Sequence, residues 1–277
     1  MPSIQSSGES LARQFMALHE APGAFVMPNP WDLGSARILA GMGFPALATS
    51  SQGFAFTQGY RDGHIERDQM LEHCSDLVAA VTVPVSADLE QGYGETPTQV
   101  ADTYRLAATI GLAGASIEDF SGEHLFEVAE AVERVHAALD GVKASGKGFV
   151  LTARAEGFLR GAPNLTEVID RLNRYGEAGA QVLYAPALPD LQALQTLCRE
   201  VSLPVNALVV GSLTQHNVAQ LGEAGASRLS VGSLFARHLL SKLVQAAQET
   251  MDQGSFGWAG DVGAHPTIAP LIDGVMR

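Results

Sequence analysis

Acidic side chains follow two short apolar segments, 83–88 and 114–118. Asp88 ends the first segment, Glu90 comes two residues later, and Glu118 ends the second. Because residues two apart in an extended chain point to the same side, we expect Asp88 and Glu90 to share one face. Oxygen-only ligands with room for water favour Mg²⁺ or Mn²⁺ over zinc, which prefers nitrogen and sulfur. The alternative is that these acids pair with arginines or cap the following helices.

An arginine ends a third apolar segment, 149–154. Arg154 at the end of a buried strand could hold a carboxylate or phosphoryl oxygen with two hydrogen bonds and stabilise the negative charge of an enolate. The alternative is a salt bridge from Arg154 to Glu156 or Glu118. The turn 49–53 is rich in hydroxyl groups, and its N–H groups could receive an anion, although serine and glycine are common in any turn.

The elements that must position these side chains alternate along the chain. Short apolar runs are separated by longer amphipathic segments, which is typical of parallel strands buried on both faces and covered by helices. Eight such runs predict a (β/α)₈ TIM-type barrel, whose catalytic groups collect where strands end. An open doubly wound sheet is the alternative, and we favour the barrel because no GxGxxG loop follows the first run. The predicted strands are 24–28, 45–49, 83–88, 114–118, 149–154, 181–185, 203–208 and 226–231.

Glycine and proline residues mark where helices pass into strands. Glycine suits the left-handed position that ends a helix, and proline stops a helix while admitting a strand. The positions are Gly43, Gly111, Gly179 and Gly225 for the first device and Pro84 and Pro204 for the second.

The two ends of the chain add helices to the predicted barrel. One precedes it at 7–20, and a long helix runs from about Ser233 to Gln253, followed by a glycine-rich tail with Trp258 and Pro266. We expect one domain over 1–277, with the extension from about 233 docking on a neighbouring subunit in a homo-oligomer, a dimer or tetramer.

Composition limits the partners of the chain. Its 277 residues are 46% hydrophobic, which suits one α/β barrel. A net charge of −13 argues against nucleic acid or an anionic membrane as partner.

Cys74 and Cys198 fall in predicted outer helices, so we expect neither a disulfide framework nor a cysteine metal site. Because the segment 1–13 lacks the apolar core of a signal peptide, we expect a cytoplasmic protein.

These residues resemble the isocitrate lyase and phosphoenolpyruvate mutase superfamily. The segment 88–94 reads Asp-Leu-Glu-Gln-Gly-Tyr-Gly and is similar to the D-x-D-x-G-Y-G signature, with Glu90 in place of the second aspartate. The segment 117–119 matches its I-E-D motif. Further matches are 28–32, Ser50-Ser51 with Asp62, Ala153-Arg154 and 228–232.

The resemblance implies a Mg²⁺ site and a small-carboxylate pocket. Asp88 would contact the ion directly or through water, Glu90 and Glu118 would hold its water shell, and Asp62 would support the site. In the same way Ser50 and Ser51 would bind the substrate carboxylate or oxo group, and Arg154 would balance charge on the enolate or phosphoryl oxygens.

The loop after the I-E-D motif departs from the family. Lyases of this superfamily carry a K-x-C-G-H-type loop there whose cysteine serves as acid or base, whereas 120–125 reads Phe-Ser-Gly-Glu-His-Leu. Glu123 and His124 are the nearest titratable replacements, and a solvated loop pair is the alternative reading for them. The absence of this cysteine favours decarboxylation over retro-aldol cleavage, because retro-aldol cleavage of a 2-hydroxy acid needs a base and loss of CO₂ does not.

The resemblance therefore predicts a Mg²⁺-dependent carbon–carbon lyase or decarboxylase that acts on a small 2-oxo or 2-hydroxy dicarboxylate through an enolate. One alternative is a C–P bond enzyme similar to phosphoenolpyruvate mutase or phosphonopyruvate hydrolase. Another, of a different class, is a non-catalytic member that binds a metabolite.

Overall fold

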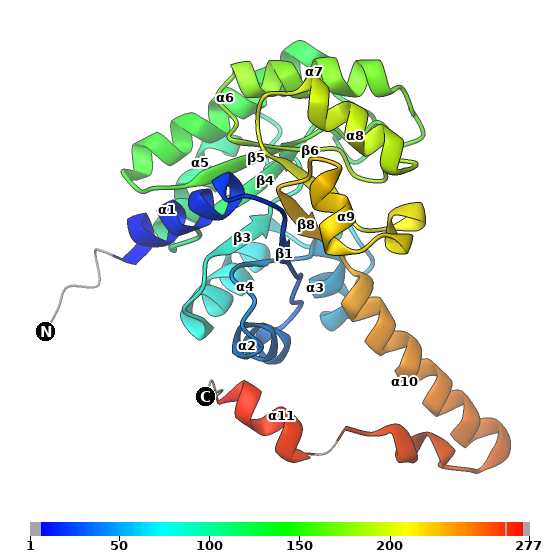
Figure 1. The fold of residues 1–277 in the computed structure, drawn as a ribbon. Helices are drawn as coiled ribbons and strands as arrows, with labels where there is room; N and C mark the ends of the chain where they lie inside the picture. The colour runs from blue at the N-terminus through cyan, green and yellow to red at the C-terminus, as the bar shows by residue number, and fades with distance from the viewer. Residues whose placement is uncertain (1–6, 264, 274–277) are drawn as a thin grey trace, which may run out of the picture.

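Eight parallel strands and the helices between them form a nearly closed (β/α)₈ barrel in the computed structural model, which describes residues 7–263 and 265–273 (Figure 1). The predicted fold class is thus confirmed. Each predicted run contains its strand, and the strands are shorter at their ends. Their bounds are β1 Phe25–Met27, β2 Leu47–Ala48, β3 Val85–Asp88, β4 Gly114–Glu118, β5 Val150–Arg154, β6 Val182–Tyr184, β7 Val205–Leu208 and β8 Arg228–Ser230.

The hydrogen bonds between neighbouring strands are not distributed evenly around the barrel. The order β1-β8-β7-β6-β5-β4-β3-β2 makes the first and last strands neighbours, which excludes an open doubly wound sheet. Between β1 and β2 the backbone link is the hydrogen bond that the Ala48 N–H donates to the Pro28 carbonyl, at 3.0 Å. Pro28 and Pro30 have no N–H to donate there, so this edge of the barrel cannot build a longer ladder.

Helices cover the outside of the ring. All four glycines predicted to end helices have a positive φ: 90° at Gly43, 99° at Gly111, 108° at Gly179 and 105° at Gly225. Cys74 and Cys198 lie in helices and are unpaired, as predicted. The helices are α1 Ser7–Glu20, α2 Leu33–Gly41, α3 Ser51–Thr57, α4 Arg67–Ala80, α5 Pro97–Thr109, α6 Val128–Ser145, α7 Leu165–Glu177, α8 Leu191–Glu200, η2 Gly211–Gln215, α9 Val218–Glu223, α10 Leu234–Gln253, η3 Gly257–Asp261 and α11 His265–Ile272.

Helix α1 closes the amino-terminal end of the barrel. Its Phe15 is fully buried against Val150 and Val182. One turn later, His19 lies between the Phe15 carbonyl, 2.7 Å from Nδ1, and Nη1 of Arg228, 3.2 Å from Nε2. Because a guanidinium only donates, Nε2 accepts and Nδ1 carries the proton. Burial and the neighbouring Arg228 charge lower the pKa of His19 to about 3.

The carboxyl-terminal segment leaves the barrel and then returns. Helix α10 points away from the ring, and α11 folds back against α2 (Figure 1). At that contact a Cβ on Gly41 would meet the Leu271 carbonyl oxygen at 2.6 Å. The helix α11 therefore packs on the barrel of its own chain, whereas α10 points away from it beyond its first turn, and docking of the extension on a neighbouring subunit stays a prediction. Within 7–263 and 265–273, no helix combines the length and the apolar character needed to cross a membrane. Residues 1–6 of the segment 1–13 lie outside the described residues.

His19 should make the fold sensitive to mild acid. Its pKa in the folded state is below the unfolded value of about 6.5, so stability is fully present above pH 6.5 and falls as the pH drops toward 3. Between pH 7 and 5 the loss should be roughly 2 kcal/mol. Urea unfolding of wild type and His19→Asn at both pH values measures it. We expect the difference between the two proteins to shrink at pH 5, and a pH-independent difference would contradict the assignment.

Candidate active site

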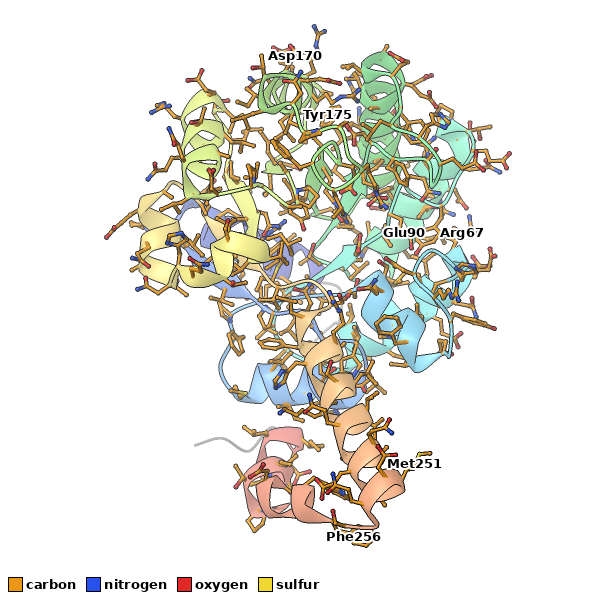
Figure 2. All side chains as sticks on the ribbon, turned by 90° about the vertical axis from the view of Figure 1, so that its right-hand side faces the viewer. Arg67, Glu90, Asp170, Tyr175, Met251 and Phe256 are labelled. Carbon is orange, nitrogen blue, oxygen red and sulfur yellow. The ribbon has the colours of Figure 1, made fainter. Side chains whose placement is uncertain are left out.

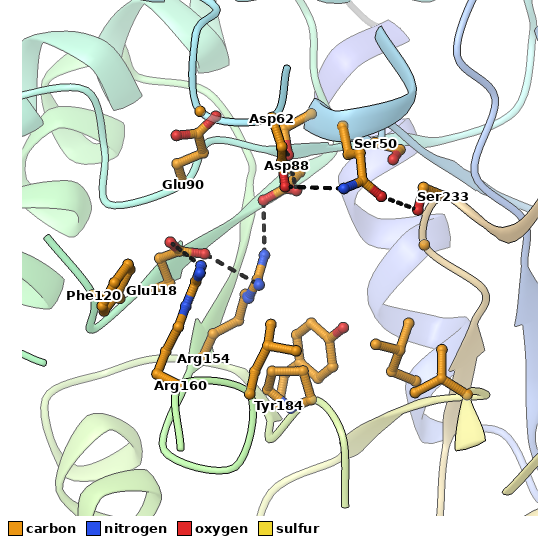
Figure 3. Close-up of a pocket in the computed structure, with 18 of the residues that line it drawn as sticks. Ser50, Asp62, Asp88, Glu90, Glu118, Phe120, Arg154, Arg160, Tyr184 and Ser233 are labelled. Carbon is orange, nitrogen blue, oxygen red and sulfur yellow. Dashed lines mark hydrogen bonds and ion pairs between the residues drawn. The ribbon is translucent and has the colours of Figure 1, made fainter. Parts of the chain in front are cut away.

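A cavity of about 690 Å³ opens at the carboxyl ends of the strands (Figure 3). It brings together every residue predicted for the site except His124. Those residues are Ser50, Ser51, Asp62, Asp88, Glu90, Glu118 and Arg154. The wall also holds residues that the sequence did not single out, among them Arg160, Tyr184, Ser233 and Arg237. Tyr184 ends β6 as Arg154 ends β5, so its position at a strand end was the signal that could have found it.

Arg154 lies at the centre of the acidic cluster. Its guanidinium contacts Asp88 Oδ1 at 2.9 Å and Glu118 Oε2 at 3.1 Å. Nε and Nη2 both donate to Glu156 Oε1, at 3.0 and 2.7 Å. The salt bridges proposed as an alternative role for Arg154 are thus present. The same guanidinium lines the cavity, so the ion pairs and a ligand-binding role are compatible.

A second arginine completes this network. Arg160 donates from Nε to Glu156 Oε2 at 3.2 Å and lies 3.7 Å from Glu118 Oε1. Its guanidinium carbon stands 3.9 Å from the centre of the Phe120 ring, a cation–π contact. Two guanidinium groups therefore face a fully buried Glu156. This charge balance allows a carboxylate to be buried beneath the cavity floor, since an unpaired one would be costly.

Asp88 is fixed by hydroxyl groups of the neighbouring segment. Ser51 Oγ donates to Asp88 Oδ2 at 3.0 Å, and the Asp88 N–H donates to Thr49 Oγ1 at 2.8 Å. Ser51 also lies 3.5 Å from Asp62. Ser50 caps α3, because its Oγ accepts from the Gly53 N–H at 3.1 Å. The hydroxyl-rich turn therefore positions the acidic group and lines the cavity at the same time.

Glu90 lies in a strained loop that an arginine holds in place. Glu90 and Tyr93 have φ values of 48° and 51°, a region that glycine usually occupies. Buried Arg134 donates from Nη2 to the carbonyls of Gln91 and Gly94, at 2.7 and 2.6 Å. The Tyr93 hydroxyl donates to Glu90 Oε1 at 3.1 Å. The loop is thus tied down at both ends of its turn.

The carboxylates of the site repel one another. Burial, followed by the charge of Asp88, raises the pKa of Glu90 to about 7 and also raises the pKa of Asp62. Burial raises the pKa of Glu118 well above its usual range. A cation in the cavity would relieve this repulsion.

The donor set fits a hydrated Mg²⁺ better than a fully protein-bound ion. Among the described residues, no three acidic, histidine or cysteine side chains converge closely enough to hold a metal ion directly. Mg²⁺ keeps several waters and usually takes one or two carboxylates, so Asp88 with Glu90 and Glu118 at the water shell meets its needs.

Asp119, the second acid of the I-E-D motif, has a structural role. Asp119 Oδ1 accepts from the Glu156 N–H at 2.8 Å, and Oδ2 accepts from the Tyr175 hydroxyl at 2.7 Å and from Arg171 at 3.2 Å. It is 2% exposed and does not line the cavity. Asp119 therefore joins the ends of β4 and β5 to α7, and this joint helps to align Glu118 and Arg154.

The short loop 120–125 is a tight turn. Phe120 and Leu125 form an antiparallel bridge, and the Ser121 N–H donates to the His124 carbonyl at 2.9 Å. The His124 ring lies 3.1 Å from Ser121 Oγ and does not line the cavity. A catalytic role for His124 stays a prediction. In this conformation of the loop, the His124 ring contacts Ser121 and lies outside the cavity lining.

A small polar cavity lies deeper in the barrel. It measures about 70 Å³ and shares Asp88, Arg154 and Tyr184 with the large one. Barrel interiors are usually filled by bulky branched side chains, whereas this one is lined by small and polar groups. Arg228, whose Nε donates to Asn206 at 2.9 Å, forms part of its wall. The volume suits about two water molecules at roughly 30 Å³ each.

The family model for phosphoenolpyruvate phosphomutase matches residues 15–251. A solved structure described as a putative lyase/mutase from Burkholderia cenocepacia J2315 is 43% identical, with a TM-score of 0.92, and the match covers 97% of this chain and 98% of that one. The 2-methylisocitrate lyase of Halalkalibacterium halodurans is 26% identical over 79% of this chain and 73% of its own length. The oxaloacetate decarboxylase of Pseudomonas fluorescens is 24% identical over 79% and 77%.

The two acids of the I-E-D motif should respond differently to loss of charge. Glu118→Gln keeps the shape of a side chain whose buried charge is costly, so we expect its unfolding free energy to stay within about 1 kcal/mol of wild type. Asp119→Asn leaves Arg171 without its buried partner and should lose about 3 kcal/mol. Urea unfolding of both variants at pH 7.5 tests this. Equal losses in the two variants would contradict the separation of roles.

Proposed function

Because the chain belongs to the phosphoenolpyruvate phosphomutase family, a family of lyases and mutases, we propose that it cleaves a carbon–carbon bond in a small 2-oxo dicarboxylate. The reaction is Mg²⁺-dependent and passes through an enolate, and decarboxylation is the favoured form. One observation carries this choice. The described part of the cavity wall combines acids and arginines with no cysteine, lysine or histidine.

That composition favours loss of CO₂ over retro-aldol cleavage. A 2-hydroxy acid needs a base to take its hydroxyl proton, and the usual neutral bases are missing from the wall. Cys74 and Cys198 do not replace them, since burial raises the pKa of each thiol to about 12 and neither lines the cavity. Decarboxylation of a 2-oxo acid starts without a base, so this site can begin it. The likeness to an oxaloacetate decarboxylase supports the same choice.

The acidic residues hold the ion and the substrate in register. Asp88 would hold the ion directly or through water, and Glu90 and Glu118 would hold its water shell. When bound, Mg²⁺ supplies a Lewis acid that polarises the oxo group of the substrate. Asp62 supports this arrangement through its bond to Ser51. The fixed φ of Glu90 and the bonds from Arg134 preorganise the ligands before any substrate enters.

The arginines and the serine turn receive the negative charge. Arg154 faces the position where the enolate oxygen develops, and charge stabilisation of this kind is commonly the largest contribution to catalysis. Backbone N–H groups at Ser50 and Ser51, together with the start of α3, hold a substrate carboxylate. Arg160 and Arg237 add positive charge to the wall. They offset a chain with a net charge of −13 at the point where an anion must enter.

Cleavage of a C–P bond is the second candidate. The observation that favours it is the number of arginines on the wall, because Arg154, Arg160 and Arg237 together suit a phosphonate dianion. The family name supports it as well. Phosphonopyruvate turnover followed by ³¹P NMR separates this activity from the first. A metabolite-binding role without catalysis, the third hypothesis, would require tight binding of one compound and turnover of none.

Activity should require a divalent cation and Asp88. The test incubates the enzyme and Mg²⁺ with oxaloacetate, isocitrate, methylisocitrate, dimethylmalate and phosphonopyruvate, following pyruvate or glyoxylate release. We expect oxaloacetate to be consumed, chelator to abolish this, and Asp88→Asn to lower kcat by at least about a hundredfold while leaving the unfolding midpoint nearly unchanged. Thr57→Ser, outside the cavity, is the control. Full turnover in excess chelator would remove the metal from the proposal.

Helix α10 is proposed to dock on a second copy of the chain. Phe235, Leu239 and Leu243 repeat every four residues and are 40%, 57% and 63% exposed, and Val244 is 64% exposed. Figure 2 shows α10 running from the barrel toward the labelled Met251 and Phe256, which are also exposed. A helix that leaves such a stripe uncovered is marginal in water. A second copy is the partner of choice because most soluble oligomers are symmetric homo-oligomers.

A charge in this stripe should dissociate the oligomer. We expect wild type to sediment as a dimer or tetramer at micromolar concentration and Leu243→Glu to shift toward the monomer, because the substitution buries a carboxylate in an apolar contact. Gln245→Glu adds the same charge at an exposed polar position of α10 and should leave the assembly intact. Analytical ultracentrifugation gives the masses, and a monomeric wild type would contradict the docking.

A further inference from the structure

An enolate formed in the cavity must receive a proton at carbon, and few groups on the wall can give one. The described wall has no histidine, cysteine or lysine. Ser51 donates its hydroxyl proton to Asp88 and Ser233 donates to Gln52, while the Ser50 oxygen accepts from the Gly53 N–H at the start of α3. The carboxyl groups are assigned to the ion and to the arginines. Among the described lining residues, the phenol of Tyr184 is an acidic group that has neither of these assignments.

Tyr184 is largely buried, and its hydroxyl has no hydrogen-bond partner among the described residues. The residue is 9% exposed, and no hydrogen bond joins its oxygen to any part of the chain that the structure describes. Buried phenol groups normally find a hydrogen-bond partner. An unsatisfied hydroxyl on a cavity wall is therefore placed to bond something that enters the cavity.

Tyr184 also lies beside Arg154, the residue that we propose stabilises the negative charge of the enolate. It pairs in register with Arg154 across β5 and β6, and the Arg154 guanidinium carbon lies 5.1 Å from the centre of its ring. In Figure 3 the Tyr184 hydroxyl points away from Glu118 and Arg160. A substrate that extends from Arg154 past the Tyr184 ring along this wall would come within reach of the phenol.

We propose that Tyr184 is a catalytic residue whose hydroxyl donates the proton to the enolate carbon after the carbon–carbon bond breaks. This inference rests on the proposed function. In the first step the bond to the leaving carboxylate breaks, CO₂ departs, and the electron pair passes into the new enolate. In the second, the enolate electron pair forms the C–H bond with the Tyr184 proton, the oxo group returns, and a phenolate remains. Water then returns a proton to the phenolate, so no oxidant or reductant is required.

Two features of the surroundings suit this role. Burial raises the pKa of Tyr184 to about 12, more than the neighbouring Arg154 charge lowers it, so the phenol carries its proton at neutral pH. The phenol also borders the 70 Å³ polar cavity, whose lining of Ser116, Asn206 and Ser230 suits water. Solvent held there could reprotonate the phenolate from the side opposite the substrate.

The test compares Tyr184→Phe with wild type by two measurements. Oxalate is a planar dianion that resembles the enolate of pyruvate, with an oxygen where the enolate has its carbon. Titration of oxalate in the presence of Mg²⁺ should give a Kd about tenfold higher for the variant, since it lacks one hydrogen bond to a charged group. With the substrate that wild type turns over, kcat should fall roughly a hundredfold with little change in KM. Tyr60→Phe, at an exposed tyrosine outside the wall, should match wild type in both measurements.

The outcomes separate this inference from the function on which it rests. An active wild type together with an oxalate Kd for Tyr184→Phe within twofold of wild type would overturn the role of Tyr184 alone. So would a large loss of kcat in His124→Ala that Tyr184→Phe does not share. A wild type that binds no oxalate with Mg²⁺ and turns over none of the compounds tested would overturn the proposed function, and the role of Tyr184 with it.

Discussion

The rest of the site depends on one buried guanidinium. Arg154 is 9% exposed and touches Asp88, Glu118 and Glu156, which come from three different strand ends. Without that positive charge, burying three carboxyl groups side by side would be costly, because a buried charge needs an opposite charge beside it. The ion pairs therefore do more than hold charge. They fix the relative positions of β3, β4 and β5 at the mouth of the barrel, and the cavity takes its shape from them.

Around the Arg154 guanidinium, the fold has polar side chains at positions where most barrels have apolar ones. Arg160 shares Glu156 and covers Phe120, Arg134 ties down the loop of Glu90, and Arg171 holds Asp119. Each of these arginines fixes a backbone turn or a carboxylate near the cavity. Rigid placement of this kind is what a site requires if charge is to be stabilised without reorganisation during the reaction. The same network explains why neighbouring residues of one motif, Glu118 and Asp119, can face different tasks.

The sequence predicted the barrel because its signals are local. Apolar runs, glycines with φ near 100° and prolines before strands each act within a few residues, and the eight strands lie inside the predicted runs. Strand-end positions also gathered Asp88, Glu118 and Arg154 on one cavity wall. The return of α11 to α2 was missed, because that contact joins segments far apart in the chain. Tyr184 was missed although it ends a strand as Arg154 does, and Arg160 was missed because nothing in its neighbours indicates which side chain of a loop turns inward. The direction of the His124 ring depends on its contact with Ser121 within the four-residue turn 121–124, and sequence spacing does not predict that contact.

The seam between β1 and β2 gives the barrel a preferred place to open. One backbone hydrogen bond, from Ala48 to Pro28, and one from the Asn29 side chain to the Thr49 carbonyl span it, whereas β4 and β5 pair over five residues. Local opening starts where few bonds must break, so breathing of the ring should concentrate on β2. Ser50 and Ser51 follow that strand directly, and Ser51 is bonded to Asp88. Motion at the seam would then reach Asp88 through the hydroxyls of Thr49 and Ser51, so the flexible side of this active site is the serine turn while the arginine side stays rigid.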